Sequence, residues 1–387
     1  MRHRVLVVVG TRPEAIKMAP VTRALGQHAD RVETRLALTG QHTTLVDQVL
    51  EAFGLHLAYD LDPAYDLALM REGQSLYDVV QVALAGLRDV LRDYRPDVLL
   101  AQGDTATVFV ASLAAFFERV RVGHVEAGLR THDKWAPFPE EIFRRLTDVI
   151  ADYHFAPTPA AAAALRAEGV PDAGVHVTGN TVVDALLVAA GLDRPAHDGA
   201  LRSIGEHDEA RLVLLTAPRR ESFGEPLREV FEAVREVADR VEDARVLYPV
   251  HPNPNVEGPA REILSDHPRI LLTEPLDYLD MVAALRHAHL VLTDSGGIQE
   301  EAPTFGAPVL VLRRVTERPE GIDAGVAELV GTDRQRIVEG SLAALARGRT
   351  GGDRRNPYGD GRAGERIADI VVANLTGEPR RTRDWSP

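Results

Sequence analysis

Acidic side chains stand where several apolar runs of this sequence end. Asp104 and Glu126 follow two successive runs, and Glu140 opens a segment with helical spacing shortly afterwards. Three carboxyl groups around one cleft suit general acid/base chemistry at a carbon or at a glycosidic oxygen, with one as base and another, held protonated, as acid. Each also has a plainer interpretation. Asp104 and Glu126 are candidates for helix caps, and Glu140 is a candidate for a surface ion pair with Arg144, four residues on.

A glycine turn indicates a second kind of site. The stretch Thr293-Asp294-Ser295-Gly296-Gly297 follows the apolar run 289–292 and leads into a helical segment. The first N–H groups of a helix have no partner in the helix, its dipole adds positive charge, and glycine lets a phosphate approach the backbone. Glu301, one turn further on, is placed to accept hydrogen bonds from a sugar hydroxyl. An ordinary capped loop is the alternative.

Basic side chains suited to an anionic ligand follow other apolar runs. Arg12 and Lys17 lie in the segment Gly10-Thr11-Arg12-Pro13-Glu14-Ala15-Ile16-Lys17, at the expected start of a helix. Arg219 and Arg220 follow the run 212–216, and Arg318 follows the run 309–312. Adjacent arginines after a strand are good neutralisers of a diphosphate. Solvated charges at helix ends are the plainer interpretation.

Composition excludes several classes of protein. The chain has 387 residues, a net charge of −14 and no cysteine, so neither a basic nucleic-acid-binding face nor a thiolate nucleophile is expected. No His/Asp/Glu spacing indicates a metal site, and the glycine motifs for nicotinamide or ATP are missing, so we expect no cofactor. The first apolar run, 5–9, is too short for a signal sequence or a membrane span. We therefore expect a cytoplasmic protein with no membrane partner.

Strand-like runs alternate with helical segments along the whole chain. This alternation predicts an α/β protein with two Rossmann-like, doubly wound domains, in which ligands bind beyond the carboxyl ends of the strands. The expected boundary is soft and lies near Thr178-Gly179-Asn180. The polar tail after Gly377 is expected to fray. The predicted strands are 5–9, 35–38, 98–101, 120–124 and 154–156 in the first series, and 212–216, 246–250, 270–272, 290–293 and 309–312 in the second.

Together these motifs resemble the non-hydrolysing bacterial UDP-N-acetylglucosamine 2-epimerases. The resemblance covers nearly the whole chain in order and is therefore specific. It is carried by Gly10-Thr11-Arg12-Pro13-Glu14, Gly40-Gln41-His42, Gly103-Asp104-Thr105, His124-Val125-Glu126-Ala127-Gly128-Leu129-Arg130-Thr131, Pro139-Glu140-Glu141, Thr178-Gly179-Asn180-Thr181, Ser295-Gly296-Gly297 and Thr316-Glu317-Arg318-Pro319-Glu320.

The resemblance implies a GT-B architecture with the active site in the interdomain cleft. The first domain, 1–178, would be completed by a C-terminal helix at about 360–376, and 179–355 would form the UDP-binding domain. The implied reaction interconverts UDP-N-acetylglucosamine (UDP-GlcNAc) and UDP-N-acetylmannosamine (UDP-ManNAc) at C2, by elimination of UDP and its re-addition to a 2-acetamidoglucal. A homodimer and a role in cell-envelope polysaccharide biosynthesis are implied as well, and no metal.

The resemblance also assigns roles to single residues. It makes three carboxylates catalytic, without deciding which is the acid and which the base: Asp104, Glu126 and Glu140. The remaining site residues are expected to bind substrate, with the glycine turn on the diphosphate and Glu301 on the ribose: Arg12, Lys17, Arg144, Arg219, His251, Met281, Ser295, Gly296, Gly297, Glu301 and Arg318.

Three departures from the family pattern bear on function. Pro218 stands where the family has a functional histidine, and proline has neither a titratable side chain nor an N–H. A hydrolysing 2-epimerase that releases free ManNAc, a GT-B glycosyltransferase and a non-catalytic UDP-sugar binder therefore stay open, with His251 as a candidate substitute for the missing histidine. Met281 replaces an expected aromatic residue near the uracil. Gly73 replaces an arginine of a regulatory UDP-GlcNAc site that Gln41, Gln74 and His251 would line, which argues against allosteric activation.

Overall fold

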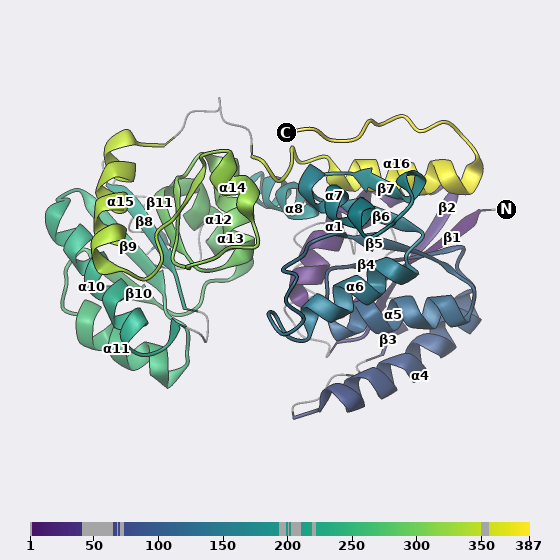
Figure 1. Cartoon of the computed structure of the whole chain (residues 1–387), viewed down its shortest axis with the longest axis horizontal. Coiled ribbons are helices and arrows are strands. Elements are labelled where there is room, and N and C mark those ends of the chain that lie inside the picture. Colours follow the sequence, from purple (N-terminus) through teal and green to yellow (C-terminus); the bar gives the residue numbers. More distant parts are fainter. Residues whose placement is uncertain are drawn as a thin grey trace. The chain divides into compact units, whose positions relative to one another are not determined.

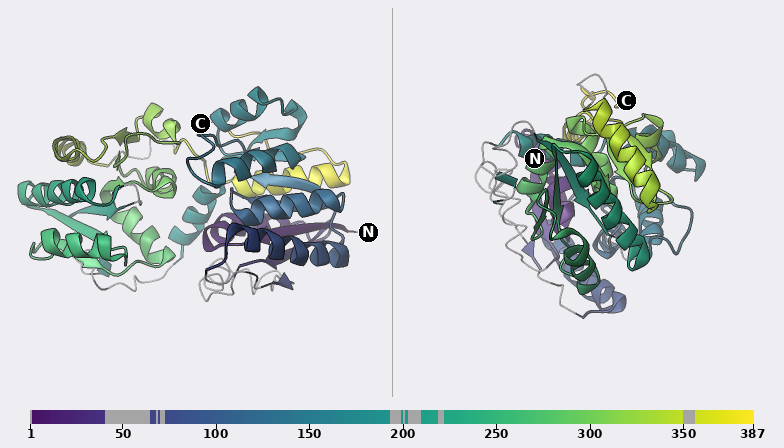
Figure 2. Two further views of the ribbon diagram at one scale, coloured as in Figure 1. Left: turned by 60° about the horizontal axis from the view of Figure 1, so that its bottom comes forward. Right: turned by 90° about the vertical axis from the view of Figure 1, so that its left-hand side faces the viewer.

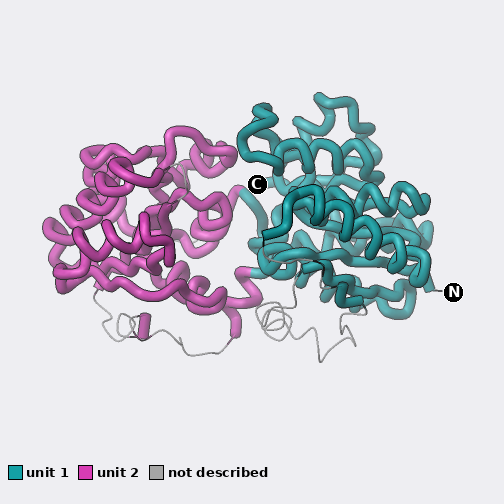
Figure 3. The backbone as a smooth tube through the Cα atoms, turned by 90° about the horizontal axis from the view of Figure 1, so that it is seen from below, with its two compact units in different colours: residues 1–185, 358–387 teal, residues 186–357 magenta. Residues whose placement is uncertain are grey.

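The computed structural model describes residues 2–40, 65–67, 69, 73–192, 199, 201–202, 210–218, 222–349 and 356–387. The chain divides into two compact units, Met1–Ala185 with Tyr358–Pro387 as the first and Leu186–Pro357 as the second (Figures 1 and 3). The first unit thus extends beyond the boundary expected near residue 178. The division into domains 1–178 and 179–355 stays a prediction.

A parallel sheet forms the centre of the first unit. In its described part the strand order is β3-β2-β1-β4-β5-β6-β7, which reverses direction between β1 and β4. The inner strands are buried on both faces, and for this reason they appear in the sequence as continuous apolar runs. The strands are β1 (His3–Val9), β2 (Val32–Leu38), β3 (Tyr65–Asp66), β4 (Val98–Gln102), β5 (Arg121–Val125), β6 (Tyr153–Ala156) and β7 (Val175–Val177).

Helices cover both faces of this sheet (Figure 1). On one face, α4 and α5 bury Leu87 and Val108 against Leu6 and Leu99 of the strands. Four helices begin with a serine or threonine that caps a free N–H group, namely Thr11, Ser75, Thr105 and Thr158. The helices are α1 (Arg12–Gly26), α4 (Leu76–Tyr94), α5 (Ala106–Phe117), α6 (Glu140–Ile150), α7 (Pro159–Ala167), α8 (Thr181–Ala190) and α16 (Ala363–Thr376).

The second unit repeats the design. Its described sheet has the order β10-β9-β8-β11-β12-β13, with the reversal between β8 and β11. Phe231 and Tyr248, with ring centroids 5.5 Å apart, lie in its core. The strands are β8 (Arg211–Thr216), β9 (Ala244–Pro249), β10 (Ile270–Thr273), β11 (Ala288–Thr293), β12 (Val309–Val311) and β13 (Ala327–Leu329). The helices are α10 (Glu225–Arg240), α11 (Pro254–Leu264), α12 (Tyr278–His287), α13 (Gly296–Glu301), α14 (Pro319–Asp323) and α15 (Arg334–Arg347).

The predicted fold class, two Rossmann-like doubly wound domains, is confirmed. Each predicted apolar run lies in or overlaps a strand, and the sequence missed only short ones: β3, β7 and β13. These three strands have only two or three residues each, too few to produce a recognisable pattern. Within the described residues, no helix combines the length and the apolar character that crossing a membrane requires.

The carboxyl-terminal helix belongs to the first unit. Helix α16, yellow in the left view of Figure 2, packs on α1 so closely that a Cβ on Gly364 would lie 2.8 Å from the carbonyl carbon of Pro20. The carboxylate of Asp184 accepts the N–H groups of Ala363 and Gly364 at 3.1 and 2.8 Å. Burial raises the pKa of Asp184 to about 7.

The expectation that the tail frays after Gly377 is wrong. Trp385 is buried against the first unit and donates its N–H to the carbonyl of Val177 at 2.8 Å. Asp369 of α16 accepts the N–H groups of Arg381 and Thr382 at 2.8 and 2.6 Å. One large aromatic anchor and these capping bonds hold a segment whose composition is otherwise polar.

Candidate active site

The candidate carboxylates of the first unit lie at the carboxyl ends of β4 and β5. Asp104 follows β4, beside the reversal of strand order where open α/β sheets bind ligands. Glu126 follows β5 directly, and its backbone takes a left-handed conformation with φ of 68°. An added Cβ on Gly103 would lie 3.9 Å from the Glu126 Oε2 atom, so the two strand ends meet at the Glu126 carboxylate.

Glu126 is the most heavily bonded of the three carboxylates. Lys17 Nζ, from α1, donates to its two oxygens at 2.7 and 2.9 Å. The side-chain amides of Gln102 and Asn180 donate to it as well, the latter at 3.1 Å. The Glu126 side chain is only 7% exposed, so an ammonium and two amide groups take the place of water around its carboxylate. Lys17, which was expected to bind substrate, is thus bonded to Glu126, a contact that the sequence did not predict.

Asp104 is held by the helix that Glu140 begins. Arg144 Nη2 donates to Asp104 Oδ2 at 2.6 Å, and α5 is capped by Thr105 instead of Asp104. The interpretation of Asp104 as a cap and that of Arg144 as the surface partner of Glu140 are both wrong, because Arg144 is buried and turns to Asp104. Its Nε and Nη1 atoms are buried without a hydrogen bond, and Nη1 lies 3.5 Å from the carboxylate of Glu141. Glu140 is half-buried.

A buried glutamate fixes the turns around this site. Glu14 accepts the Gly10 N–H at 2.6 Å and the Thr105 hydroxyl at 2.8 Å, which ties the turn after β1 to the turn after β4. Burial raises the pKa of Glu14, although these hydrogen bonds oppose the shift. Arg12 is exposed at the first position of α1. Sequence reasoning gave no role to Glu14 itself.

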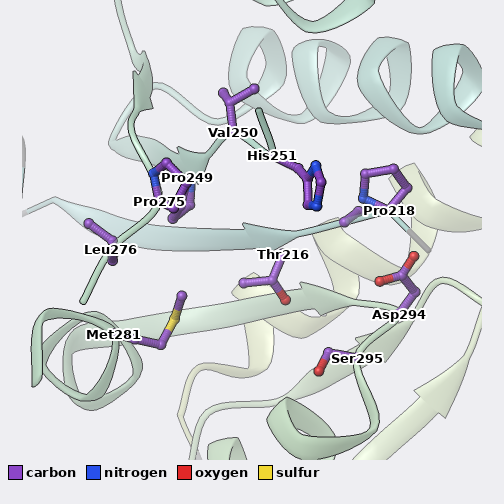
Figure 4. A pocket seen from close by; sticks show the side chains of 11 residues that line it. Thr216, Pro218, Pro249, Val250, His251, Pro275, Leu276, Met281, Asp294 and Ser295 are labelled. Atoms are coloured by element: carbon purple, nitrogen blue, oxygen red, sulfur yellow. The ribbon is translucent and has the colours of Figure 1, made fainter. Parts of the chain in front are cut away.

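The second unit contains a pocket of about 330 Å³ at the carboxyl ends of β8, β9 and β11 (Figure 4). This volume lies within the range of small-molecule and cofactor sites. Apolar side chains form most of the wall, and polar groups lie at the strand ends on either side of the β8/β11 reversal. The lining residues are Thr216, Ala217, Pro218, Pro249, Val250, His251, Pro275, Leu276, Met281, Asp294 and Ser295.

Pro218 and His251 lie next to each other on this pocket (Figure 4). His251 Nδ1 accepts the Asn253 N–H at 3.2 Å, so in a neutral ring the proton sits on Nε2. Met281 lines the same pocket. Arg219, Arg220 and Gln41 lie outside the described residues, while Gln74 donates to the Leu69 carbonyl at 3.1 Å in the first unit.

The predicted glycine turn is present at the start of α13. Ser295 is the residue before the helix, and its side chain caps no N–H group there. Gly296 lies against Arg318, whose guanidinium carbon would be 2.6 Å from an added Cβ. Glu300 and Glu317 bind that guanidinium at 2.8 and 2.7 Å and hold it over the turn. The structure thus brings together residues from two distant predicted motifs.

Glu301 ends helix α13 and is half-buried. Burial, with the charge of Glu301 nearby, raises the pKa of Tyr278. Gln102 and Asn180 were missed as site residues by sequence reasoning. Asn180 stands in a motif that we used for the family resemblance and as a domain boundary, without giving Asn180 a role, and its position after β7 was the available signal. Among the described residues, no group of three acidic or histidine side chains is arranged to hold a metal ion.

Two Rossmann-like units, one with strand-end carboxylates and one with a pocket of about 330 Å³ beside a glycine turn, define a protein of GT-B-like fold. Residues 23–372 match the UDP-N-acetylglucosamine 2-epimerase family, and the chain belongs to it. It is 45% identical to the UDP-N-acetylglucosamine 2-epimerase of Escherichia coli O157:H7, over 96% of this chain and 99% of that one.

Solved structures agree with this assignment. The UDP-GlcNAc 2-epimerase of Neisseria meningitidis, solved with UDP-GlcNAc, matches with a TM-score of 0.81 and 40% identity over 97% of this chain and all of that one. The Methanocaldococcus jannaschii enzyme, solved with UDP-GlcNAc and UDP, matches with a TM-score of 0.76 and 32% identity over 95% and 99% of the two chains. The family predicted from the sequence is confirmed.

Proposed function

We propose that this protein reversibly epimerises UDP-GlcNAc to UDP-ManNAc without hydrolysing it. A base takes the proton from C2, the C–H electron pair forms the C1=C2 double bond, and the C1–O bond breaks with its electrons on UDP. UDP then adds back to C1 of the 2-acetamidoglucal while C2 is protonated on the opposite face. The observation that carries the proposal is the set of strand-end carboxylates, which C2 proton transfer needs, in a chain of this family.

The carboxylates Asp104, Glu126 and Glu140 are the proposed proton-transfer groups. Proton transfer by a positioned side chain contributes about 10²–10⁴-fold to a rate. Asp104→Asn, Glu126→Gln and Glu140→Gln are each expected to lose activity on that scale and still bind UDP in calorimetry. Variants that still consume UDP-GlcNAc at the wild-type rate would favour a glycosyltransferase, because transfer of a sugar does not require C2 proton abstraction.

The pocket of the second unit is the proposed holder of the leaving UDP. Its apolar wall, including Met281, suits the uracil, and the structures of relatives with UDP or UDP-GlcNAc support a ligand of this class. Ser295, Gly296, Gly297 and Arg318 are proposed for the diphosphate and Glu301 for the ribose. Arg12, Lys17, Arg144 and Arg219 are the remaining proposed substrate-binding groups. The proposal requires both units to act on one substrate molecule.

Pro218 keeps one alternative open. A pocket that contains proline in place of the family histidine can retain UDP binding yet release the sugar before re-addition. His251, beside Pro218, is the proposed substitute donor (Figure 4). The alternative product is free ManNAc with UDP.

One experiment separates these functions. The protein is incubated with UDP-GlcNAc in D₂O and the products are followed by proton and phosphorus NMR. UDP-ManNAc with deuterium at C2 supports the epimerase, and free ManNAc with UDP indicates the hydrolysing reaction. Unchanged, undeuterated UDP-GlcNAc would refute both and leave a UDP-sugar binder, which calorimetry would detect.

A homodimer is also proposed. The first unit exposes apolar side chains on neighbouring helices, among them Phe116 and Phe117 of α5 and Val149 of α6, each at least 61% exposed. Exposed apolar groups in such numbers are typical of a protein interface. Light scattering after gel filtration would test the mass, and a monomer at micromolar concentration would refute the dimer.

A further inference from the structure

His124 is a fully buried histidine near the end of β5. Its Nδ1 lies 2.6 Å from Asp148 Oδ1 and its Nε2 lies 2.8 Å from the carbonyl oxygen of Gly103. A carbonyl oxygen only accepts hydrogen bonds, so Nε2 must donate. Asp148 also accepts from Arg130 at 2.7 Å and from the Gly128 N–H, so it is ionised and Nδ1 must donate as well. Both ring nitrogens carry protons, and His124 is an imidazolium.

The surroundings of the ring maintain this charge. Burial alone would lower the pKa of His124, but the charge of Asp148 and the hydrogen bonds to Asp148 and Gly103 raise it. Asp104 acts in the same direction from the end of β4. Arg130 and Glu168 continue the chain of alternating charges, with two contacts of 2.9 Å between them. His154, on β6, also faces two main-chain acceptors, the oxygen of Asp148 at 2.7 Å and that of Gly174 at 3.3 Å, but neither belongs to the Gly103–Asp104 turn.

His124 links the three segments that carry the candidate carboxylates, through two bonds of its ring and through its own strand. The Gly103 carbonyl is part of the peptide bond to Asp104, and β5, which contains His124, continues into Glu126. Asp148 lies on α6, which begins with Glu140 and also carries Arg144, the partner of Asp104. One buried histidine therefore ties together the supports of all three groups.

We propose that His124 is a positioning residue for the C2 chemistry, its doubly donating ring clamping the Gly103–Asp104 turn to α6 beneath the carboxylates. This inference rests on the proposed function. His124 touches no substrate in this role. It acts by fixing where Asp104 and α6 stand relative to Glu126. A neutral ring would lose one of the two bonds, and the turn or the helix would be released.

The test compares His124→Gln with His154→Gln, a matched loss of a buried histidine from the neighbouring strand. An error of about 1 Å in placing reacting groups costs about 100-fold in rate. We expect kcat of His124→Gln to fall by that factor, with KM and the UDP affinity measured by calorimetry nearly unchanged. We expect His154→Gln to lose much less kcat, because its ring contacts α6 but not the Gly103–Asp104 turn. Equal losses of kcat in both variants, or no loss in His124→Gln, would overturn the proposal.

A second measurement does not depend on turnover. In the folded wild-type protein, nitrogen-15 NMR of the imidazole rings should show the His124 ring with both nitrogens protonated at pH 8, its signals being assigned by their loss from folded His124→Asn. A wild-type spectrum in which no ring is doubly protonated at pH 8 would overturn the clamp. If the wild-type protein fails to epimerise UDP-GlcNAc, the proposed function is refuted, and the nitrogen spectrum then decides on the clamp alone.

Discussion

Lys17 is one of only two lysines in the chain, and replacing it tests the contribution of its ion pair with Glu126. Lys17→Met removes the ammonium while keeping most of the apolar stem. Glu126 then loses two charge-assisted hydrogen bonds of 2.7 and 2.9 Å in a place where its side chain is only 7% exposed. Breaking a buried pair by removing one partner costs about 3–5 kcal/mol.

The contacts that Glu126 keeps in Lys17→Met determine how much of the free energy of unfolding is lost. Gln102 and Asn180 still donate to Glu126, so we expect a loss near the lower end, about 3 kcal/mol in the free energy of unfolding. We expect kcat for UDP-GlcNAc to fall by about 100-fold, because Glu126 is no longer held in one place. Urea denaturation followed by fluorescence and the NMR epimerase assay measure the two quantities.

The other lysine provides the control. Lys134 is exposed and its ammonium lies 5.2 Å from the centre of the Trp135 ring, so Lys134→Met changes the same functional group at the surface. We expect it to alter stability by less than about 1 kcal/mol. A Lys17→Met protein with wild-type stability and kcat, or one no more affected than Lys134→Met, would refute the role of the pair.

Three further changes have definite expected outcomes. In Gly296→Ala the added Cβ would lie 2.6 Å from the guanidinium carbon of Arg318 and should displace that group. We expect UDP binding, measured by calorimetry, to weaken about tenfold. An unchanged affinity would contradict this geometry. Pro218→His should raise the ratio of UDP-ManNAc to free ManNAc among the products, and a ratio that stays the same would show that this position does not control re-addition. Between pH 5 and 7 the melting temperature should fall, because folded Asp184, whose pKa burial raises from 3.8 to about 7, still holds a proton that the unfolded chain has lost, and the slope should level off above pH 7. Asp184→Asn should flatten this slope; an identical slope would contradict the assignment.

The sequence predicted the sheet and the strand-end turns because both have local causes. A strand buried on both faces must be a continuous apolar run, as in 98–101, and the residue after it must lie at the ligand-binding edge. Asp104, Glu126 and the glycine turn could be found in this way. Their bonding partners could not, because Lys17 and Asn180 lie 109 and 54 residues from Glu126 in the chain. Which carboxylate meets which donor depends on the tertiary fold.

The segment after Gly377 also shows why the sequence alone did not predict every contact. Its composition is polar, and it is held by the buried Trp385, by Asp369, which accepts two of its N–H groups, and by contacts of Glu378, Arg383 and Asp384 with the first unit. A single buried aromatic side chain does not produce a periodic pattern, so it carries no signal in a window of sequence. The alternative of a surface pair between Arg144 and Glu140 is wrong for a related reason, while the substrate-binding role of Arg144 stays a prediction. The spacing to Glu140 is correct for a surface pair, but burial directs the guanidinium to Asp104.

The return of α16 to the first unit has a consequence for synthesis of the chain. Domains generally fold as units in the order in which the ribosome delivers them. Here the second unit, Leu186–Pro357, is continuous, while the first unit includes Tyr358–Pro387. The carboxylate-bearing unit therefore waits for the last segment to be translated, although its own first residues emerged earliest. Until then the surface of α1 that Gly364 covers stays exposed, and a chain interrupted before α16 would present that surface to chaperones and proteases.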